Sequence, residues 1–285
     1  MLGRMSHFAD RLAASVEEKG APLCVGLDPM PDRLPDELRG PDLAASYELF
    51  CRGIVDAVAD VAVAVKPQSA FFEAVGSRGV AVFERVCEYA RAAGLLVVAD
   101  VKRGDIPSTA AGYAAAFAPL ADATTVSPYM GRDSLEPFLE RGLGLFVLVK
   151  TSNPGSADLQ DLPLADGRPL WHHVAGFVDE LGSAHAGASG LSSVGAVVGA
   201  THPGVVETAR KLMPRAVLLI LGVGAQGASL GEVAPAFVQH PAGGLVSISR
   251  PILYAYEKRG GDWRQAAAAE ARSVAEQLGR TIRVE

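Results

Sequence analysis

The feature of this sequence that most restricts its fold is a short apolar run, rich in Val, Ile, Leu and Ala, that recurs eight times. Each run is almost continuously apolar, as is typical of parallel strands that are covered on both faces. The segments between the runs place apolar residues at helical spacing, for example at Val80, Phe83, Val86 and Ala90. The runs are Pro22–Pro29, Val61–Gln68, Leu95–Lys102, Ala123–Met130, Leu145–Ser152, Val194–Thr201, Ala216–Gly224 and Gly244–Pro251.

Eight strand–helix units without a break in composition predict an α/β fold, a closed (β/α)8 TIM barrel. Periodicity alone leaves an open, doubly wound sheet as the alternative. The segment His7–Lys19 predicts an extra N-terminal helix at the N-terminal mouth of the barrel, and Trp263–Ile282 predicts the last helix. We expect Ser46 to begin one of the other helices and Gly94 to end the helix before the third strand. Residues 1–285 are then a single barrel domain.

Composition favours a small-molecule enzyme over a nucleic-acid-binding protein. Of the 285 residues 49% are hydrophobic, and the formal net charge is −6, with no block of Lys or Arg. The N-terminus does not read as a signal peptide, and no apolar stretch reaches the roughly 18 residues of a membrane span. Cys24, Cys51 and Cys87 are too few and too scattered for a disulfide framework, so we expect buried thiols in a cytoplasmic protein.

Charged residues stand at the ends of the first three predicted strands, where a barrel builds its active face. Asp28 ends the first run, Lys66 the second, and Asp100 and Lys102 the third, with Asp105 just beyond. Asp100 and Lys102 are two residues apart, so their side chains share one face of the strand, within reach of Lys66. The pattern predicts a cluster of acids and bases in a partly dry pocket. A purely structural ion-pair network is the alternative.

The last two predicted strands end in residues suited to an anion. The seventh run leads into a glycine-rich turn over residues 222–227, and the eighth ends beside Arg250. Glycines let backbone N–H groups approach a phosphate, and barrel enzymes commonly hold phosphate after these two strands. The sequence therefore predicts a phosphate site, with an ordinary turn as the alternative.

The run Asp100-Val101-Lys102-Arg103-Gly104-Asp105 resembles the D-x-K-x-x-D signature of the orotidine 5′-monophosphate decarboxylases. Asp28, Lys66, the turn at 224–227 and Arg250 stand where that family has matching residues. The segments 66–73 and 150–155 further resemble its longer, mycobacterial-type bacterial branch. The similarity spans essentially the whole chain. One departure is Leu221, where many relatives have Pro before the Gly-Val-Gly turn.

The resemblance implies a homodimeric lyase that converts orotidine 5′-monophosphate to UMP and CO2, the last step of de novo pyrimidine nucleotide synthesis, without any cofactor. Lys102 would protonate C6 of the pyrimidine, Asp100 would face the substrate carboxylate, and Lys66 would hold Asp100 and the ribose hydroxyls. The loop near Gln226 would move on binding. The other implied contacts are Asp28 with the ribose, Ser127 with the base, Gly224, Gln226 and Arg250 with the phosphate, and Asp105, Ile106 and Thr109 with the active site of the partner subunit.

Two other functions remain possible at this stage. Metal-dependent sugar-phosphate decarboxylases and synthases share the Asp-x-Lys-x-x-Asp run, but they need a further carboxylate near the second strand, where Lys66, Pro67 and Gln68 stand here. A barrel that binds nucleotides without turnover is the second. The histidines show no metal-ligand spacing, so we expect no metal site. The long segment Ser152–Arg168 is either a lid or a surface elaboration.

Overall fold

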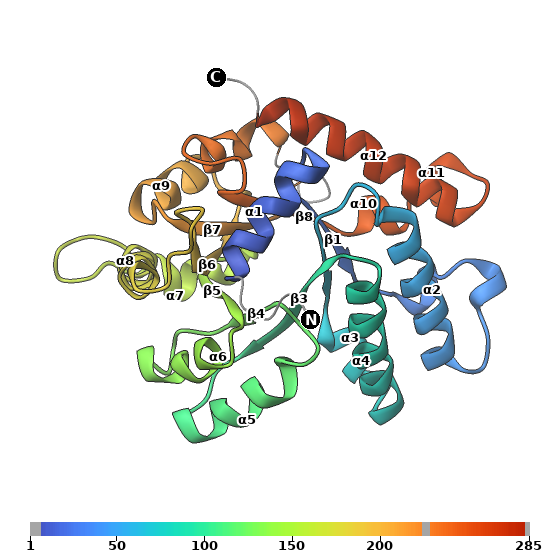
Figure 1. Ribbon diagram of the computed structural model, residues 1–285, viewed down its shortest axis with the longest axis horizontal. Helices are drawn as coiled ribbons and strands as arrows, with labels where there is room; N and C mark the ends of the chain where they lie inside the picture. Colours follow the sequence, from blue (N-terminus) through green and yellow to red (C-terminus); the bar gives the residue numbers. More distant parts are fainter. Residues whose placement is uncertain (1–6, 224–228, 283–285) are drawn as a thin grey trace.

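The computed structural model describes residues 7–223 and 229–282. Eight parallel strands pair in chain order, and the last pairs with the first, which closes the barrel. This confirms the predicted (β/α)8 barrel over the open sheet (Figure 1). The strands are β1 Leu23–Leu27, β2 Ala64–Pro67, β3 Leu96–Arg103, β4 Ala123–Val126, β5 Gly144–Lys150, β6 Ser192–Gly199, β7 Ala216–Leu221 and β8 Gly244–Ile248.

Helices surround the ring of strands in Figure 1. Within the described residues, no helix combines the length and apolar character that crossing a bilayer requires. The α-helices are α1 Phe8–Lys19, α2 Leu43–Val58, α3 Ser69–Glu73, α4 Ser77–Ala92, α5 Pro107–Phe117, α6 Glu136–Glu140, α7 Ala157–Gln160, α8 Leu170–Ser183, α9 Val205–Leu212, α10 Arg250–Leu253, α11 Tyr256–Arg259 and α12 Trp263–Thr281. The 3-10 helices are η1 Pro31–Arg33, η2 Asp36–Leu38, η3 Arg132–Ser134, η4 Pro154–Ser156 and η5 Leu230–Phe237.

Helix α1 is the predicted extra helix, and it packs against the N-terminal mouth of the barrel. Its buried face consists of Phe8, Ala9, Leu12 and Val16. Phe8 makes an edge-on contact with Phe146 of β5, with ring centroids 5.9 Å apart. Gly144, the first residue of β5, leaves room for this ring, because a Cβ there would lie 2.2 Å from the Phe8 ring. The helix therefore closes the end of the barrel where the strands begin.

The interior face of the barrel changes character along the strands. On β3, Leu96 and Val98 pack inside the barrel with Cys24, Phe146 and the residues of α1, whereas Val97 and Ala99 pack outward against the helices. Asp100 continues the inward series by two residues. The interior is therefore apolar near the N-terminal mouth and polar near the C-terminal mouth. As predicted, Cys24, Cys51 and Cys87 are buried free thiols.

Several predicted element boundaries are wrong, among them the start of α2 and the end of the fourth strand, and two others are confirmed. The Asp42 side chain, which accepts from Ala45 N–H at 3.2 Å, caps α2, while Ser46 is buried inside the helix and donates to the Asp42 carbonyl. The fourth strand ends at Val126, four residues before the predicted Met130. Gly94, with φ of +81°, follows the end of α4 as expected. The predicted last helix is confirmed as α12.

Candidate active site

A cavity of about 210 Å³ opens at the C-terminal mouth of the barrel. Predicted site residues from four strand ends line this cavity together, although they lie far apart in the sequence. It also contains side chains that the sequence did not single out. The lining residues are Asp28, Lys66, Gln68, Asp100, Lys102, Ser152, Leu221, Gly222, Val223, Ser247, Ser249, Arg250 and Pro251.

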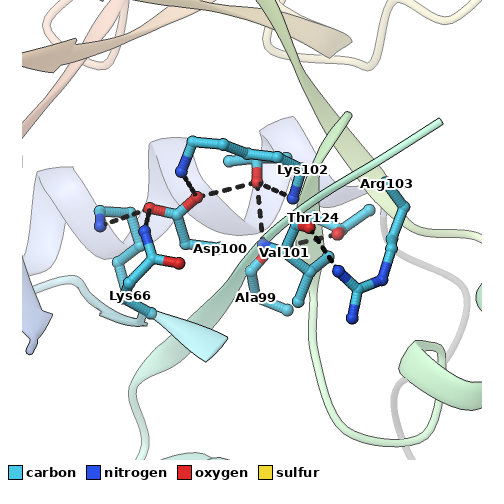
Figure 2. A network of polar contacts seen from close by, with 9 residues as sticks. Lys66, Ala99, Asp100, Val101, Lys102, Arg103 and Thr124 are labelled. Carbon is cyan, nitrogen blue, oxygen red and sulfur yellow. Dashed lines mark hydrogen bonds and ion pairs between the residues drawn. The ribbon is translucent and has the colours of Figure 1, made fainter. Parts of the chain in front are cut away.

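Asp100 is the centre of the cavity's polar network and lies between two lysines (Figure 2). Its Oδ2 accepts a hydrogen bond from Lys66 Nζ at 2.8 Å, and its Oδ1 accepts one from Lys102 Nζ at 2.5 Å. The side chains of Lys66 and Asp100 are 6% and 4% exposed, but that of Lys102 is 41% exposed. Lys66 and Asp100 are thus a buried pair, while Lys102 presents its ammonium group to the cavity.

Two neutral side chains complete the coordination of Asp100. Gln68 Nε2 donates to Oδ2 at 3.0 Å, and Thr125 Oγ1 donates to Oδ1 at 2.9 Å. Neither residue was predicted as part of the site. The signal that could have found them is strand alternation, since Gln68 follows Lys66 by two residues and Thr125 follows the inward-facing Ala123 by two. Each carboxylate oxygen of Asp100 therefore accepts two hydrogen bonds.

The environment fixes the charges of the buried pair. Burial alone would raise the pKa of Asp100, but the positive charges of Lys66 and Lys102 outweigh it and hold that pKa well below its usual range. Burial alone would lower the pKa of Lys66, but the charges of Asp100 and Asp28 raise it above its usual range. Both groups are therefore ionised across the neutral pH range.

Asp28 lies at the end of β1 and lines the cavity beside Lys66. Its Oδ1 is buried and has no hydrogen-bond partner among the described residues. A buried carboxylate oxygen without a partner is costly unless something else donates to it. This oxygen is therefore suited to accept a hydrogen bond from a ligand hydroxyl or from water.

The opposite side of the cavity is formed by the ends of β7 and β8. Gly222, with φ of +87°, follows β7, and Arg250 is the first residue of α10, exposed at the rim. Both line the cavity, so the predicted anion-binding elements and the lysine network share one space. The predicted phosphate contacts Gly224 and Gln226 lie outside the described residues.

Four predicted site residues do not line this cavity within one chain. Asp105, Ile106 and Thr109 lie in the loop after β3 and the first turn of α5, where Ile106 is 53% exposed. Ser127 follows β4, and its backbone N–H donates to the Arg103 carbonyl. The serine of this region that does line the cavity is Ser152, after β5. Ser127 therefore does not line the cavity of the single chain, and its contact with the base stays a prediction.

The segment after β5 is fixed by contacts with the buried end of that strand. Lys150 Nζ, buried at the end of β5, contacts both carboxylate oxygens of Asp161 at 2.7 and 2.8 Å. Gln160 accepts from Thr151 N–H at 2.9 Å. These contacts anchor the segment beside Ser152.

No group of three or more His, Cys, Asp or Glu side chains within the described ranges could hold a metal ion.

Comparison with known proteins points to one family. The sequence profile of the orotidine 5′-phosphate decarboxylase / HUMPS family matches residues 21–264. Orotidine 5′-phosphate decarboxylase of Rhodopirellula baltica is 44% identical, over 96% of this chain and 99% of that protein. The Roseiflexus castenholzii protein of the same name is 43% identical, over 97% and 99%. The structure of Leishmania donovani OMP decarboxylase is 34% identical and superposes with a TM-score of 0.78, over 98% of this chain and 100% of that one.

Proposed function

The chain belongs to the orotidine 5′-phosphate decarboxylase / HUMPS family, and we propose that it converts orotidine 5′-monophosphate to UMP and CO2 without a metal or an organic cofactor. The observation that carries the proposal is the Asp100 carboxylate, buried between two lysines in a cavity that also contains Arg250. The reaction would be the last step of de novo pyrimidine nucleotide synthesis, performed by residues 1–285 as a single catalytic domain.

Lys102 is the proposed proton donor. When the bond between C6 and the carboxylate breaks, its electron pair stays on C6, an sp2 carbon that no ring carbonyl conjugates well. A fixed positive charge next to C6 stabilises this carbanion without reorganisation. Lys102 Nζ then gives C6 a proton, CO2 departs, and the neutral amine regains its proton from solvent. The exposure of Lys102 to the cavity supports this role.

Asp100 and Lys66 hold the charges around that step in place. Asp100 fixes the Lys102 ammonium group and would face the carboxylate that leaves, while Lys66 neutralises Asp100 from the barrel interior. Lys66 and Asp28 together would bind the ribose hydroxyls, with a hydroxyl donating to the buried Oδ1 of Asp28. The network then recognises the sugar on one side and the reacting carbon on the other.

The phosphate and the base would occupy the remaining walls of the cavity. The Arg250 guanidinium group would donate charge-assisted hydrogen bonds to the phosphate. Backbone N–H groups after β7, together with Gly224 and Gln226, are further proposed contacts. Because the phosphate is remote from the reacting bond, its binding energy can order the site. For the polar edge of the base, the geometry favours Ser152 over Ser127, since Ser152 lines the cavity.

We further propose a homodimer in which Asp105, Ile106 and Thr109 complete the active site of the partner subunit. Large apolar side chains are exposed on the neighbouring loops after β3 and β4: Ile106 at 53%, Tyr129 at 83% and Met130 at 45%. Such a patch is suited to an interface. Mixing inactive Lys102→Ala and Asp105→Ala subunits should restore about a quarter of wild-type turnover, because each mixed dimer has one intact site. No recovery from mixed dimers would show that Asp105 acts within its own subunit.

The test of the reaction is the change in ultraviolet absorbance when the purified protein is mixed with orotidine 5′-monophosphate in the presence of EDTA. Rapid loss of the substrate signal supports the proposal. Turnover of a sugar phosphate that requires Mg²⁺, with none of the nucleotide, would instead favour the metal-dependent members of the family. Tight binding of UMP without turnover of the nucleotide would make the chain a non-catalytic nucleotide-binding barrel.

A further inference from the structure

We propose that the Thr125 hydroxyl is a positioning group that fixes the Lys102 amine at its working place in the cavity. The inference deepens the proposed decarboxylation and rests on it. Thr125 lies on the inward face of β4, and its residue is 1% exposed. It touches Asp100 and the backbone of Lys102, and it does not itself line the cavity.

The backbone at Lys102 needs a specific support. Its φ is +45°, and among the described residues it is the only non-glycine with a positive φ. An L-residue adopts this conformation only when surrounding contacts compensate for it, and such residues cluster at active sites. The pairing of β3 with β4 is irregular at this point, between Ala99 and Arg103. The regular ladder therefore does not supply the support.

Thr125 supplies it with a single oxygen. Its Oγ1 accepts from Val101 N–H at 3.0 Å and from Lys102 N–H at 2.9 Å, and it donates to Asp100 Oδ1 at 2.9 Å. A hydroxyl has two acceptor lone pairs and one donor hydrogen, so these three bonds use its full capacity. One side chain thus satisfies both N–H groups of the irregular segment and orients the carboxylate.

The same hydroxyl constrains Lys102 at both ends. Asp100 Oδ1, which accepts from Thr125, also accepts from Lys102 Nζ at 2.5 Å. Thr125 therefore holds the Lys102 main chain directly and its ammonium group through Asp100. A lysine side chain is long and flexible, and a misplacement of about 1 Å at a reacting group can cost on the order of 10²-fold in rate. A change at Thr125 should act on the chemical step more than on substrate binding.

The neighbouring Thr124 provides a matched control. It lies on the same strand and is 0% exposed, but its side chain is on the opposite face and donates to the Ala99 carbonyl at 3.2 Å (Figure 2). It has no hydrogen bond to Asp100 or to the Lys102 main chain among the described contacts. If Thr125 only stabilised the pairing of β3 with β4, substitutions at the two threonines should affect turnover alike.

The experiment compares kcat and KM for orotidine 5′-monophosphate in the wild type, Thr125→Val, Thr125→Ser and Thr124→Val, together with the Tm of each. Removal of the Thr125 hydroxyl should lower kcat by roughly 10- to 100-fold with KM changed less than about threefold. Thr125→Ser, which restores the hydroxyl, should return kcat to within about threefold of the wild type. Thr124→Val should lower Tm while leaving kcat within about twofold.

Three results would overturn the inference: a wild-type kcat in folded Thr125→Val, failure of Thr125→Ser to recover turnover, or an equal loss of kcat in Thr124→Val. If Thr125→Val does not fold, Thr125→Ala takes its place with the same expected direction. A wild type that does not turn over the nucleotide would refute the proposed function instead. The inference would then be decided by the crystal structure of Thr125→Val, in which Lys102 should leave its positive φ.

Discussion

Two buried aspartates occupy opposite ends of the same pair of strands, and they are held in different ways. Asp100, near the C-terminal mouth, bonds two lysines that both line a cavity, and of these Lys102 is the one whose side chain is substantially exposed. Asp122, just before β4, lies at the N-terminal mouth. Its Oδ1 contacts Arg11 of α1 at 2.5 Å, and its Oδ2 accepts from Val97 N–H at 2.8 Å. Both are carboxylates paired with cations, but their surroundings leave different groups available.

At the N-terminal mouth, the hydrogen-bond partners of Asp122 connect helices and strands to one another. The contact of Arg11 with Asp122 joins α1 to the start of β4. The Val97 N–H lies near the start of β3, close to the apolar residues that α1 covers. At the C-terminal mouth Lys102 retains donor capacity toward an open cavity. A buried ion pair is therefore not by itself a sign of catalysis. An ionised partner that remains open to a cavity is the distinguishing feature, and this agrees with the usual division of a barrel into a stabilising end and an active end.

The largest effect should come from Lys102→Ala. Loss of the ammonium group removes both the charge next to C6 and the proton donor, so we expect kcat to fall by at least about 10³-fold. Asp100 keeps Lys66, Gln68 and Thr125 as partners, so the free energy of unfolding should change by no more than about 1 kcal/mol. Steady-state kinetics and urea unfolding of one preparation measure both. A large loss of stability with little loss of turnover would show that Lys102 acts in stability and not in catalysis.

Asp122→Ala should give the opposite result. The substitution leaves Val97 N–H and Arg11 without their carboxylate, and we expect a loss of about 2 kcal/mol in the free energy of unfolding. kcat should be unchanged, because Asp122 lies at the other mouth of the barrel. Asp122→Asn is the control, since its side-chain carbonyl can still accept from Val97, and it should lose less. A tenfold fall in kcat in a folded Asp122→Ala protein would contradict the division between the two ends.

The stability of the Asp100 pair should depend on pH in a defined direction. The pKa of Asp100 is lower in the folded protein than in the unfolded chain, so its stabilisation is present above about pH 4 and is lost as the pH falls toward the folded-state value. The pKa of Lys66 is raised on folding, so its stabilisation is present at neutral pH and is lost as the pH rises above about 10. Urea unfolding of the wild type and Asp100→Asn at a series of pH values measures the first effect. The difference in stability between the two proteins should shrink below about pH 4, and a difference that stays constant into acid would show that Asp100 is not responsible.

The smallest effect should come from Arg11→Met. The Arg11 side chain is 31% exposed, and Asp122 keeps its bond from Val97 N–H when Arg11 is replaced. We expect a loss of about 1 kcal/mol or less in thermal or urea unfolding, with normal kcat. A loss larger than that of Asp122→Ala would mean that α1 depends on Arg11 for more than this ion pair.

The sequence allowed the strands to be placed because their apolar runs are continuous, and it located Lys66, Asp100 and Lys102 because charged residues at strand ends are conspicuous. It did not identify Gln68 or Thr125, since a neutral side chain in a strand carries no such signal until the inward register is known. Alternation counted from Lys66 past the end of β2, and from the inward-facing Ala123 along β4, would have been needed.

The other errors arose where a boundary depends on competing local contacts. Ser46 is a common type of helix-capping residue, but Asp42, four residues earlier, also caps well and is the N-cap of α2. The fourth strand was predicted to run to Met130, yet β4 ends at Val126. Periodicity predicts that an element exists more reliably than it predicts the residue at which the element ends.

The most direct test of the account is to remove the amine at position 102 and then restore it chemically. Lys102→Cys is assayed with orotidine 5′-monophosphate before and after alkylation with 2-bromoethylamine, which converts the new thiol to a lysine analogue. The native thiols Cys24, Cys51 and Cys87 are buried, and alkylated wild type serves as the control. We predict that Lys102→Cys is nearly inactive and that alkylation raises its turnover by at least about tenfold. Turnover close to the wild-type rate before alkylation would contradict the account, because no amine at this position would then be needed.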